Sequence, residues 1–210
     1  MSRQWLNIKF HHKEKICYTK YSNNEQGESM TKIAVLAGSL RADSMNKQLA
    51  KIIEGFVSSD VKFIHLDISE VPLFNQDLEA DVPASVKKLK ADIDSVDGVL
   101  LITPEYNRGM PGVIKNAIDW ASRPYGDNSF DRKPVAITGS TGSPWGTVGA
   151  QQQLRVVMSY LNAHIMGQPE LYIGAFNPVL NAEGVMEDHI KERLTGFVTA
   201  LEAHVALFKK

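Results

Sequence analysis

The sequence predicts a doubly wound α/β fold in which five parallel strands, in the order 2-1-3-4-5, lie between two layers of helices. Short apolar segments rich in Val, Ile and Leu alternate about five times with longer segments whose apolar residues have helical spacing. Several of the short segments are almost continuously apolar, which is typical of parallel strands buried on both faces. Right-handed crossovers make 2-1-3-4-5 the natural order, with ligands bound at the carboxyl ends of strands 1 and 3.

The first half of the chain supplies two strands and two helices. The first strand is expected over 32–38, where small and β-branched residues lead to a glycine, and a helix with an apolar stripe over 44–57. A second strand is expected over 61–66. A long loop over 67–80 then covers the edge of the cleft, and a proline opens a helix over 83–96.

The second half continues the same alternation. The segment 98–103 is nearly all apolar and is expected to be a central strand, and Pro111 opens the helix that follows. The remaining expected elements are a strand over 134–138, a helix over 148–161, a last strand in pieces within 163–172 and a closing helix around 190–205.

A short polar loop between the first strand and the first helix carries side chains suited to a phosphate. Ser39 and Ser44 offer hydroxyl groups, Arg41 a guanidinium and Asn46 an amide. The start of the helix adds free N–H groups and a positive dipole end. Charge-assisted hydrogen bonds contribute about 1.5–3 kcal/mol each and the dipole about 0.3–1 kcal/mol, so the side chains should dominate. Alternatively, Ser44 only caps the helix and Arg41 is a solvated surface charge.

A second polar loop follows the central strand and is suited to a planar ring. Pro104 stiffens the turn, and Tyr106 gives a flat surface with a polar tip. Gly109 and Gly112 allow close approach of a ring, and exposed backbone N–H groups can reach its polar edge. The alternative is a surface turn in which Glu105 only contacts solvent. Both loops follow strands expected to be neighbours, so we expect them to meet at one edge of the sheet.

Together the two motifs, Gly-Ser-Leu-Arg with Ser44 and Asn46 and then Thr-Pro-Glu-Tyr-Asn over 103–107, resemble the NADPH-dependent FMN reductase family. The resemblance is strongest to its bacterial quinone and chromate reductase branch and extends from about Thr31 to near the C-terminus. It implies a flavodoxin-like fold. It also implies that the first loop holds the FMN phosphate and that the second lies against the isoalloxazine ring.

The resemblance and the loop chemistry together give a set of expected cofactor-binding residues. A Gly-Ser loop after a third strand adds Ser140, at a position where the family contacts the flavin, although such loops are also common turns. Trp145 in the same loop is expected either to wall the cleft or to pack on a partner subunit. The residues expected to bind FMN are Ser39, Arg41, Ser44, Met45, Asn46, Pro104, Glu105, Tyr106, Asn107 and Ser140.

The resemblance implies an FMN-dependent NAD(P)H oxidoreductase. NAD(P)H would deliver hydride to the flavin N5 and leave, and a quinone, free flavin, azo compound or chromate would accept the electrons at the same face. No acid–base catalytic residue and no metal are expected, and neither a Walker A loop nor a G-x-G-x-x-G fingerprint is present. The alternative is a non-enzymatic flavodoxin-like electron carrier or redox-responsive binding module. Arg41 argues against it, because flavodoxins usually hold phosphate with a Thr- and Ser-rich loop.

Composition limits the partners and the location. A formal net charge of -1 gives no electrostatic case for nucleic acid or an anionic membrane, and the single Cys17 fits a reducing compartment, so a cytoplasmic protein is expected. Residues 1–29 are polar and are interpreted as a flexible N-terminal extension, with the FMN-binding reductase domain over 30–210. Small-molecule electron acceptors and a homodimer or homotetramer are the partners that the resemblance implies.

Overall fold

The sheet has the predicted strand order. The computed structural model describes residues 30–175 and 186–209, so the expected extension over 1–29 lies outside the described residues. The strands run β2-β1-β3-β4-β5, every described pair is parallel, and β6 also pairs with β4. Their bounds are β1 Thr31–Ala37, β2 Val61–His65, β3 Gly98–Ile102, β4 Pro134–Ser140, β5 His164–Ile165 and β6 Leu171–Ile173. The last strand is therefore in two pieces, as its sequence predicts.

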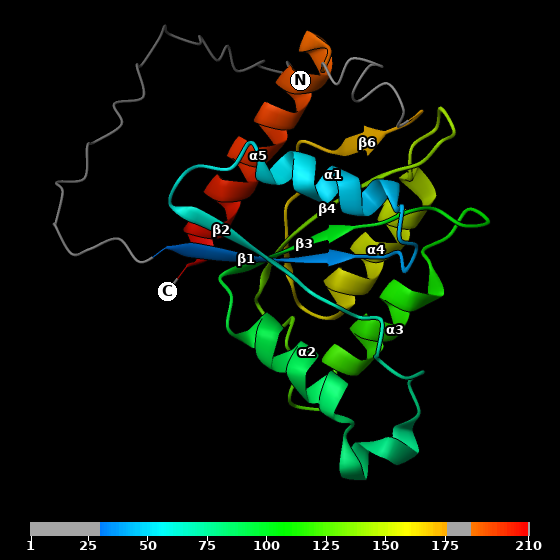
Figure 1. Cartoon of the computed structure of the whole chain (residues 1–210). Helices are drawn as coiled ribbons and strands as arrows, with labels where there is room; N and C mark the ends of the chain where they lie inside the picture. The colour runs from blue at the N-terminus through cyan, green and yellow to red at the C-terminus, as the bar shows by residue number, and fades with distance from the viewer. Residues whose placement is uncertain (1–29, 176–185, 210) are drawn as a thin grey trace, which may run out of the picture.

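Helices cover both faces of the sheet (Figure 1). They are α1 Met45–Glu54, α2 Ala84–Asp94, α3 Gly112–Ala121, α4 Val148–Tyr160 and α5 Asp188–Phe208. Side chains alternate along β1, so that Ile33 and Val35 pack in one core with α1 and α5. Ala34 and Leu36 pack in the other core with α2, α3 and α4. Burial on both faces explains why the strand sequences are almost continuously apolar.

Several predicted elements differ from the structure by one to three residues at their ends, and the ends of α1 and β4 have an identifiable cause. Helix α1 ends at Glu54 rather than at 57, because Gly55 takes the C-cap position and its N–H bonds the Ile52 carbonyl at 3.0 Å. Strand β4 continues to Ser140, two residues beyond the predicted end, because Thr138, Gly139 and Ser140 pair with β6.

The segment predicted as a long loop after β2 contains a short helix and packs on α3. The 3-10 helix η1, Gln76–Asp81, begins where the side chain of Asn75 accepts the Asp77 N–H at 3.0 Å. Before it, the ring of Phe74 packs edge-on against Trp120 with centroids 4.9 Å apart, and Trp120 donates its indole N–H to the Pro72 carbonyl at 2.8 Å. The segment thus covers the outer side of α3.

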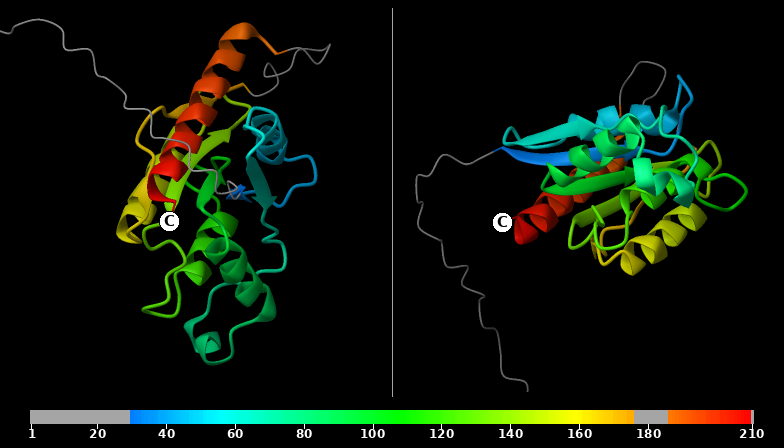
Figure 2. Two further views of the ribbon diagram at one scale, coloured as in Figure 1. Left: turned by 90° about the vertical axis from the view of Figure 1, so that its left-hand side faces the viewer. Right: turned by 90° about the horizontal axis from the view of Figure 1, so that it is seen from below.

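The loops after β1, β3 and β4 leave the sheet at the same edge (Figure 2). Two backbone hydrogen bonds continue the ladder into them. The Gly38 N–H donates to the Ile102 carbonyl at 2.8 Å, and the Thr103 N–H donates to the Thr138 carbonyl at 2.9 Å. The predicted meeting of the first two loops is therefore confirmed, and the third loop joins them.

Candidate functional site

The loop between β1 and α1 presents two buried hydroxyl groups. Ser39 and Ser44 are 4% and 2% exposed. The oxygen of Ser44 accepts the Lys47 N–H at 3.3 Å as the N-cap of α1, and the oxygen of Ser39 accepts the Arg41 N–H at 3.4 Å. Neither hydroxyl proton has an acceptor among the residues that the structure describes. Each serine can therefore cap its own turn and still donate to a ligand.

Backbone donors surround these hydroxyls. Within the described ranges, the N–H groups of Leu40 and of residues 42–46 donate to no other residue. Those of Met45 and Asn46 open α1, where the helix dipole favours an anion. The side chain of Arg41 is exposed and forms no ion pair with any described residue. This donor set, with one unneutralised cation, has the chemistry that a phosphate monoester requires.

Asn46 ties the first loop to the end of β4. Its Nδ2 donates to the Ser140 carbonyl at 2.9 Å, and its Oδ1 accepts the Ser140 N–H at 2.8 Å. The hydroxyl of Ser140 lies 3.3 Å from the same oxygen, and both residues are buried. The amide that the sequence assigns to the phosphate is thus already engaged by protein, with one Nδ2 hydrogen left over. Direct contact of Asn46 or Ser140 with a flavin stays a prediction.

The loop after β3 is a tight turn closed by its own backbone. Tyr106 and Gly109 exchange two N–H···O=C bonds of 3.0 Å each. Asn107 and Arg108 between them have φ values of 52° and 64°, the conformation of a two-residue type I′ turn. The N–H groups of Glu105 and Asn107 donate to no residue in the described part of the chain, and the Tyr106 side chain is 50% exposed. The turn is a fixed support with two free donors and a phenol ring.

Glu105 fixes this turn to α4. Its side chain is 9% exposed, and its Oε2 accepts the N–H of Ala150 in the first turn of α4 at 3.1 Å. A carboxylate at a helix N-terminus is stabilised by the dipole and pairs an otherwise free donor. Gln153 adds a second link, accepting the Met110 N–H at 3.0 Å. The carboxylate that the sequence assigns to the flavin ring therefore points into protein, and only the backbone of Glu105 remains available to a ligand.

The three loops meet on a closely packed floor. A Cβ on Gly38 would lie 3.4 Å from Pro104 Cδ and 3.2 Å from Ile114 Cβ, so the first two loops are in contact. A Cβ on Gly139 would overlap the Thr103 carbonyl oxygen and lie 2.5 Å from Thr147 Oγ1. Only glycine fits between the ends of β3 and β4.

The expected residues therefore form one site with two kinds of role. Ser39, Ser44 and Arg41 present free donors, and Tyr106 presents an open ring face. Asn46 and Glu105 instead hold loops together, and Met45, the first residue of α1, packs against the core. The links to Ala150 and Gln153 were not foreseen, because they join positions 45 and 43 residues apart and leave no local sequence signal.

Two further searches cover only the described residues. Residues 30–175 and 186–209 contain no group of three or more His, Cys, Asp or Glu side chains arranged to hold a metal ion. None of the helices in those ranges is long and apolar enough to cross a membrane.

Comparisons with known proteins show the family of the chain. A family model described as NADPH-dependent FMN reductase matches residues 31–178. A 2-hydroxy-1,4-benzoquinone reductase from a Burkholderia species is 44% identical over 175 residues, 83% of this chain and 96% of that protein. A quinone reductase from Pseudomonas putida is 35% identical over 176 residues, 83% of this chain and 95% of the relative. The solved structure of FerB, a flavoenzyme NAD(P)H:(acceptor) oxidoreductase from Paracoccus denitrificans, superposes with a TM-score of 0.81 at 40% identity, covering 86% of this chain and all of FerB.

Proposed function

The chain belongs to the NADPH-dependent FMN reductase family, and we propose that it is an FMN-dependent oxidoreductase that transfers electrons from NAD(P)H to quinones. The observation that carries the proposal is the set of unpaired donors at the start of α1, brought against the turn after β3. Donors of this kind suit the phosphate of FMN, and a rigid turn with a phenol ring suits its planar part. The relatives are named as reductases, which favours an enzyme over an electron carrier.

We assign the first loop to the phosphate. Arg41 supplies the cation and charge-assisted hydrogen bonds, and the hydroxyls of Ser39 and Ser44 donate from buried positions. Asn46 keeps the loop in place through Ser140 and has one hydrogen left for the ligand. Met45 contributes its backbone N–H in the first turn of α1. Because most of these donors are held by the fold before the ligand arrives, little ordering is required on binding.

We assign the second loop to the ring. Tyr106 offers a flat surface, Pro104 stiffens the turn from a buried position, and the backbone N–H groups of Glu105 and Asn107 offer donors to the carbonyl and nitrogen edge of an isoalloxazine. Donors at that edge stabilise negative charge that develops on reduction. The Glu105 carboxylate keeps these donors in position by holding the turn to α4.

Bound FMN supplies two-electron chemistry, accepting hydride equivalents from NAD(P)H and passing them to an acceptor. We propose that donor and acceptor use one open face of the flavin in turn, which is a ping-pong order. The reason is that the sequence contains no dinucleotide fingerprint that would indicate a separate NAD(P)H site. An open face bounded by a half-exposed Tyr106 would also admit free flavins, azo compounds and chromate. The protein positions the reactants, because the described loops supply hydrogen-bond donors and a flat surface and contain no acid–base pair.

The activity is tested with the purified protein after it has been saturated with FMN. We expect a flavin absorption spectrum that persists through gel filtration and is bleached by NADPH, with oxidation of NADPH in the presence of 1,4-benzoquinone. Double-reciprocal plots at several quinone concentrations should be parallel for a ping-pong order. A protein that retains no flavin, or that is bleached only by a separate reductase, would contradict the proposal.

We further propose that the chain forms a homodimer or homotetramer through α4. Val148, Val156 and Tyr160 of this helix are 43%, 71% and 84% exposed, and Trp145 just before it is 68% exposed. Large apolar side chains exposed together on one helix are typical of a subunit interface. Light scattering should give a mass of two or four chains, and Val156→Glu should shift it toward one; a monomeric wild-type protein would overturn the assignment.

The proposed reductase domain comprises residues 30–210. The family match begins at residue 31, directly after the polar segment 1–29. We expect limited proteolysis to remove that segment and leave NADPH-quinone activity intact, whereas an inactive core would contradict the division. A reducing, cytoplasmic location agrees with the single Cys17.

A further inference from the structure

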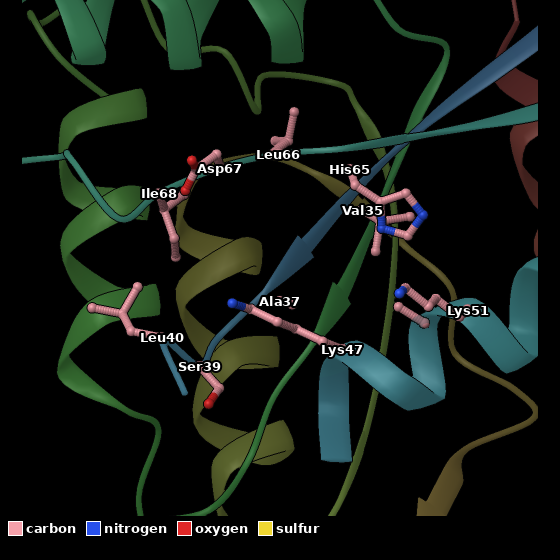
Figure 3. A pocket seen from close by; sticks show the side chains of 11 residues that line it. Val35, Ala37, Ser39, Leu40, Lys47, Lys51, His65, Leu66, Asp67 and Ile68 are labelled. Atoms are coloured by element: carbon pink, nitrogen blue, oxygen red, sulfur yellow. The ribbon is translucent and has the colours of Figure 1, made fainter. Parts of the chain in front are cut away.

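A cavity of about 220 Å³ lies between β1, β2 and α1, next to the phosphate loop (Figure 3). Ser39 and Leu40 form the wall that it shares with that loop. Because β2 and β3 lie on opposite sides of β1, the cavity lies across the first loop from the turn after β3. None of the roles assigned above to the flavin site requires it.

Two lysines of α1 give the cavity its charge. Lys47 and Lys51 are one helical turn apart and both line it, and their ammonium groups form no ion pair or hydrogen bond within the described ranges. In Figure 3 the Lys47 side chain extends along the cavity from α1 toward Leu40, while Lys51 lies on the same side as His65. Both lysines are exposed, and two cations against the single carboxylate of the lining leave a net positive charge that favours an anion.

Asp67 supplies the one carboxylate of the lining, on the side of the cavity opposite α1. Its Oδ1 accepts the Ser69 N–H at 2.9 Å, and this hydrogen bond, helped by the nearby charge of Lys47, lowers the pKa of Asp67. An ionised carboxylate accepts hydrogen bonds only, so it suits a hydroxyl group on the ligand.

The floor of the cavity is apolar and its size is that of one ring. Val35, Ala37, Ala50, Leu66 and Ile68 supply the apolar lining. Benzene fits an engineered cavity of about 150 Å³, and sites for larger ligands begin at about 300 Å³. A volume of about 220 Å³ therefore suits a substituted single ring and is too small for a dinucleotide.

We propose that this cavity is a second binding site, separate from the flavin site, for a hydroxylated single-ring aromatic carboxylate. The ring rests on the apolar floor, the carboxylate is held by Lys47 and Lys51, and the hydroxyl group donates a hydrogen bond to the Asp67 carboxylate. The residues that line the cavity take their positions without bound flavin, so the proposal does not rest on the reductase activity.

The test is a calorimetric titration of the full-length protein with 4-hydroxybenzoate, with and without saturating FMN. We expect one site per chain in both cases, at least tenfold weaker binding in the double variant Lys47→Gln/Lys51→Gln, and unchanged binding in Lys62→Gln. Lys62 is the matched control, an exposed lysine of β2 outside the cavity lining. The uncharged 4-hydroxybenzamide should bind at least tenfold more weakly than the acid.

Three outcomes would overturn the proposal: no binding to the wild-type protein, equal binding to the double variant, or displacement of the ligand by FMN. The last would show that the acid occupies the flavin site. The absorption spectrum of the same samples reports flavin retention independently. A protein that binds FMN and not the acid contradicts only this inference, and one that binds the acid and not FMN contradicts only the proposed function.

Discussion

The loops after β1 and β3 occupy equivalent places in the sheet and are built in different ways. In the first loop and the helix start after it, the N–H groups of Leu40 and of residues 42–46 bond no other described residue, and Arg41 is exposed. The second loop closes on itself through Tyr106 and Gly109 and is held to α4 through Glu105. The first loop keeps most of its backbone donors for a ligand, whereas the second uses those of Tyr106, Gly109 and Met110 to become rigid.

This difference matches the two ends of the proposed ligand. A doubly charged phosphate is bound best by many free donors, because each charge-assisted bond contributes about 1.5–3 kcal/mol. A planar ring is bound best by a surface that does not move, because little ordering is then lost on binding. If the comparison is correct, substitutions in the first loop should change FMN affinity, and those in the links to β4 and α4 should change stability first.

The largest effect is expected for Asn46→Ala. The substitution leaves the N–H and the carbonyl of Ser140 buried without their partners at 2.8 and 2.9 Å. We expect the free energy of unfolding in urea, without FMN, to fall by about 2–4 kcal/mol, because each unpaired buried group costs about 1–3 kcal/mol. Gln48→Ala, at an exposed position of the same helix, is the control and should change stability little. Equal stabilities for the two variants would show that the link to β4 is not structural.

A somewhat smaller loss of folding stability is expected for Glu105→Ala. The Ala150 N–H loses its acceptor, and α4 loses a carboxylate at its N-terminus, which together should lower the unfolding free energy by about 1–3 kcal/mol. Glu105→Gln keeps an acceptor of the same shape and should recover most of that loss. Urea denaturation of both variants without FMN provides the measurement. If glutamine is as damaging as alanine, the carboxylate has a role beyond this hydrogen bond.

Arg41→Ala should act on the ligand and not on the fold. Loss of one exposed charge-assisted contact, at about 1.5 kcal/mol the low end of that range, raises the FMN dissociation constant about tenfold. The unfolding free energy without FMN should stay unchanged, because the side chain is exposed and pairs with no described residue. Flavin fluorescence titration measures the first quantity, and Arg41→Lys should recover part of the affinity. Undiminished flavin occupancy in the alanine variant would refute the phosphate role.

The smallest effect is expected for Arg108→Gly. Arg108 has φ of 64°, which glycine adopts without strain, and its ion pair with Glu105 is long at 3.5 Å and exposed. We expect the unfolding free energy to rise by about 0.5–1 kcal/mol, with FMN affinity unchanged. Asn107→Gly should raise the unfolding free energy by less, because asparagine tolerates this backbone conformation better than arginine. A loss of stability in Arg108→Gly would mean that the ion pair outweighs the backbone strain.

Local patterns predict most of this fold because its determinants are local. Continuous apolar runs identify the buried strands, and Ser44 identifies the start of α1, where its side chain caps the helix. Gly55 marks the end of α1, but the apolar stripe continues to Val57 and favours a longer helix. Likewise, Asn75 was a signal for η1 within a segment interpreted as loop.

The division of labour within the site could not be predicted, because it depends on tertiary contacts. The sequence places Asn46 and Glu105 in the right loops, yet their partners lie 94 and 45 residues away. Any polar side chain in a ligand-binding loop can face either the ligand or the protein, and periodicity does not distinguish the two. The oxygens of Ser39 and Ser44 accept backbone hydrogen bonds within the loop, so each hydroxyl hydrogen remains free for a ligand. Arg41 likewise keeps the charge of its side chain for a ligand.

Gly139 limits how this enzyme can be redesigned. Any side chain at this position would push the end of β4 away from Thr103 and Thr147, and the loops on either side would separate with it. Mutant libraries aimed at new electron acceptors should therefore keep this spacer fixed and diversify the exposed position Tyr106. Changes there should alter which molecules reach the proposed flavin face without disturbing the packing beneath it.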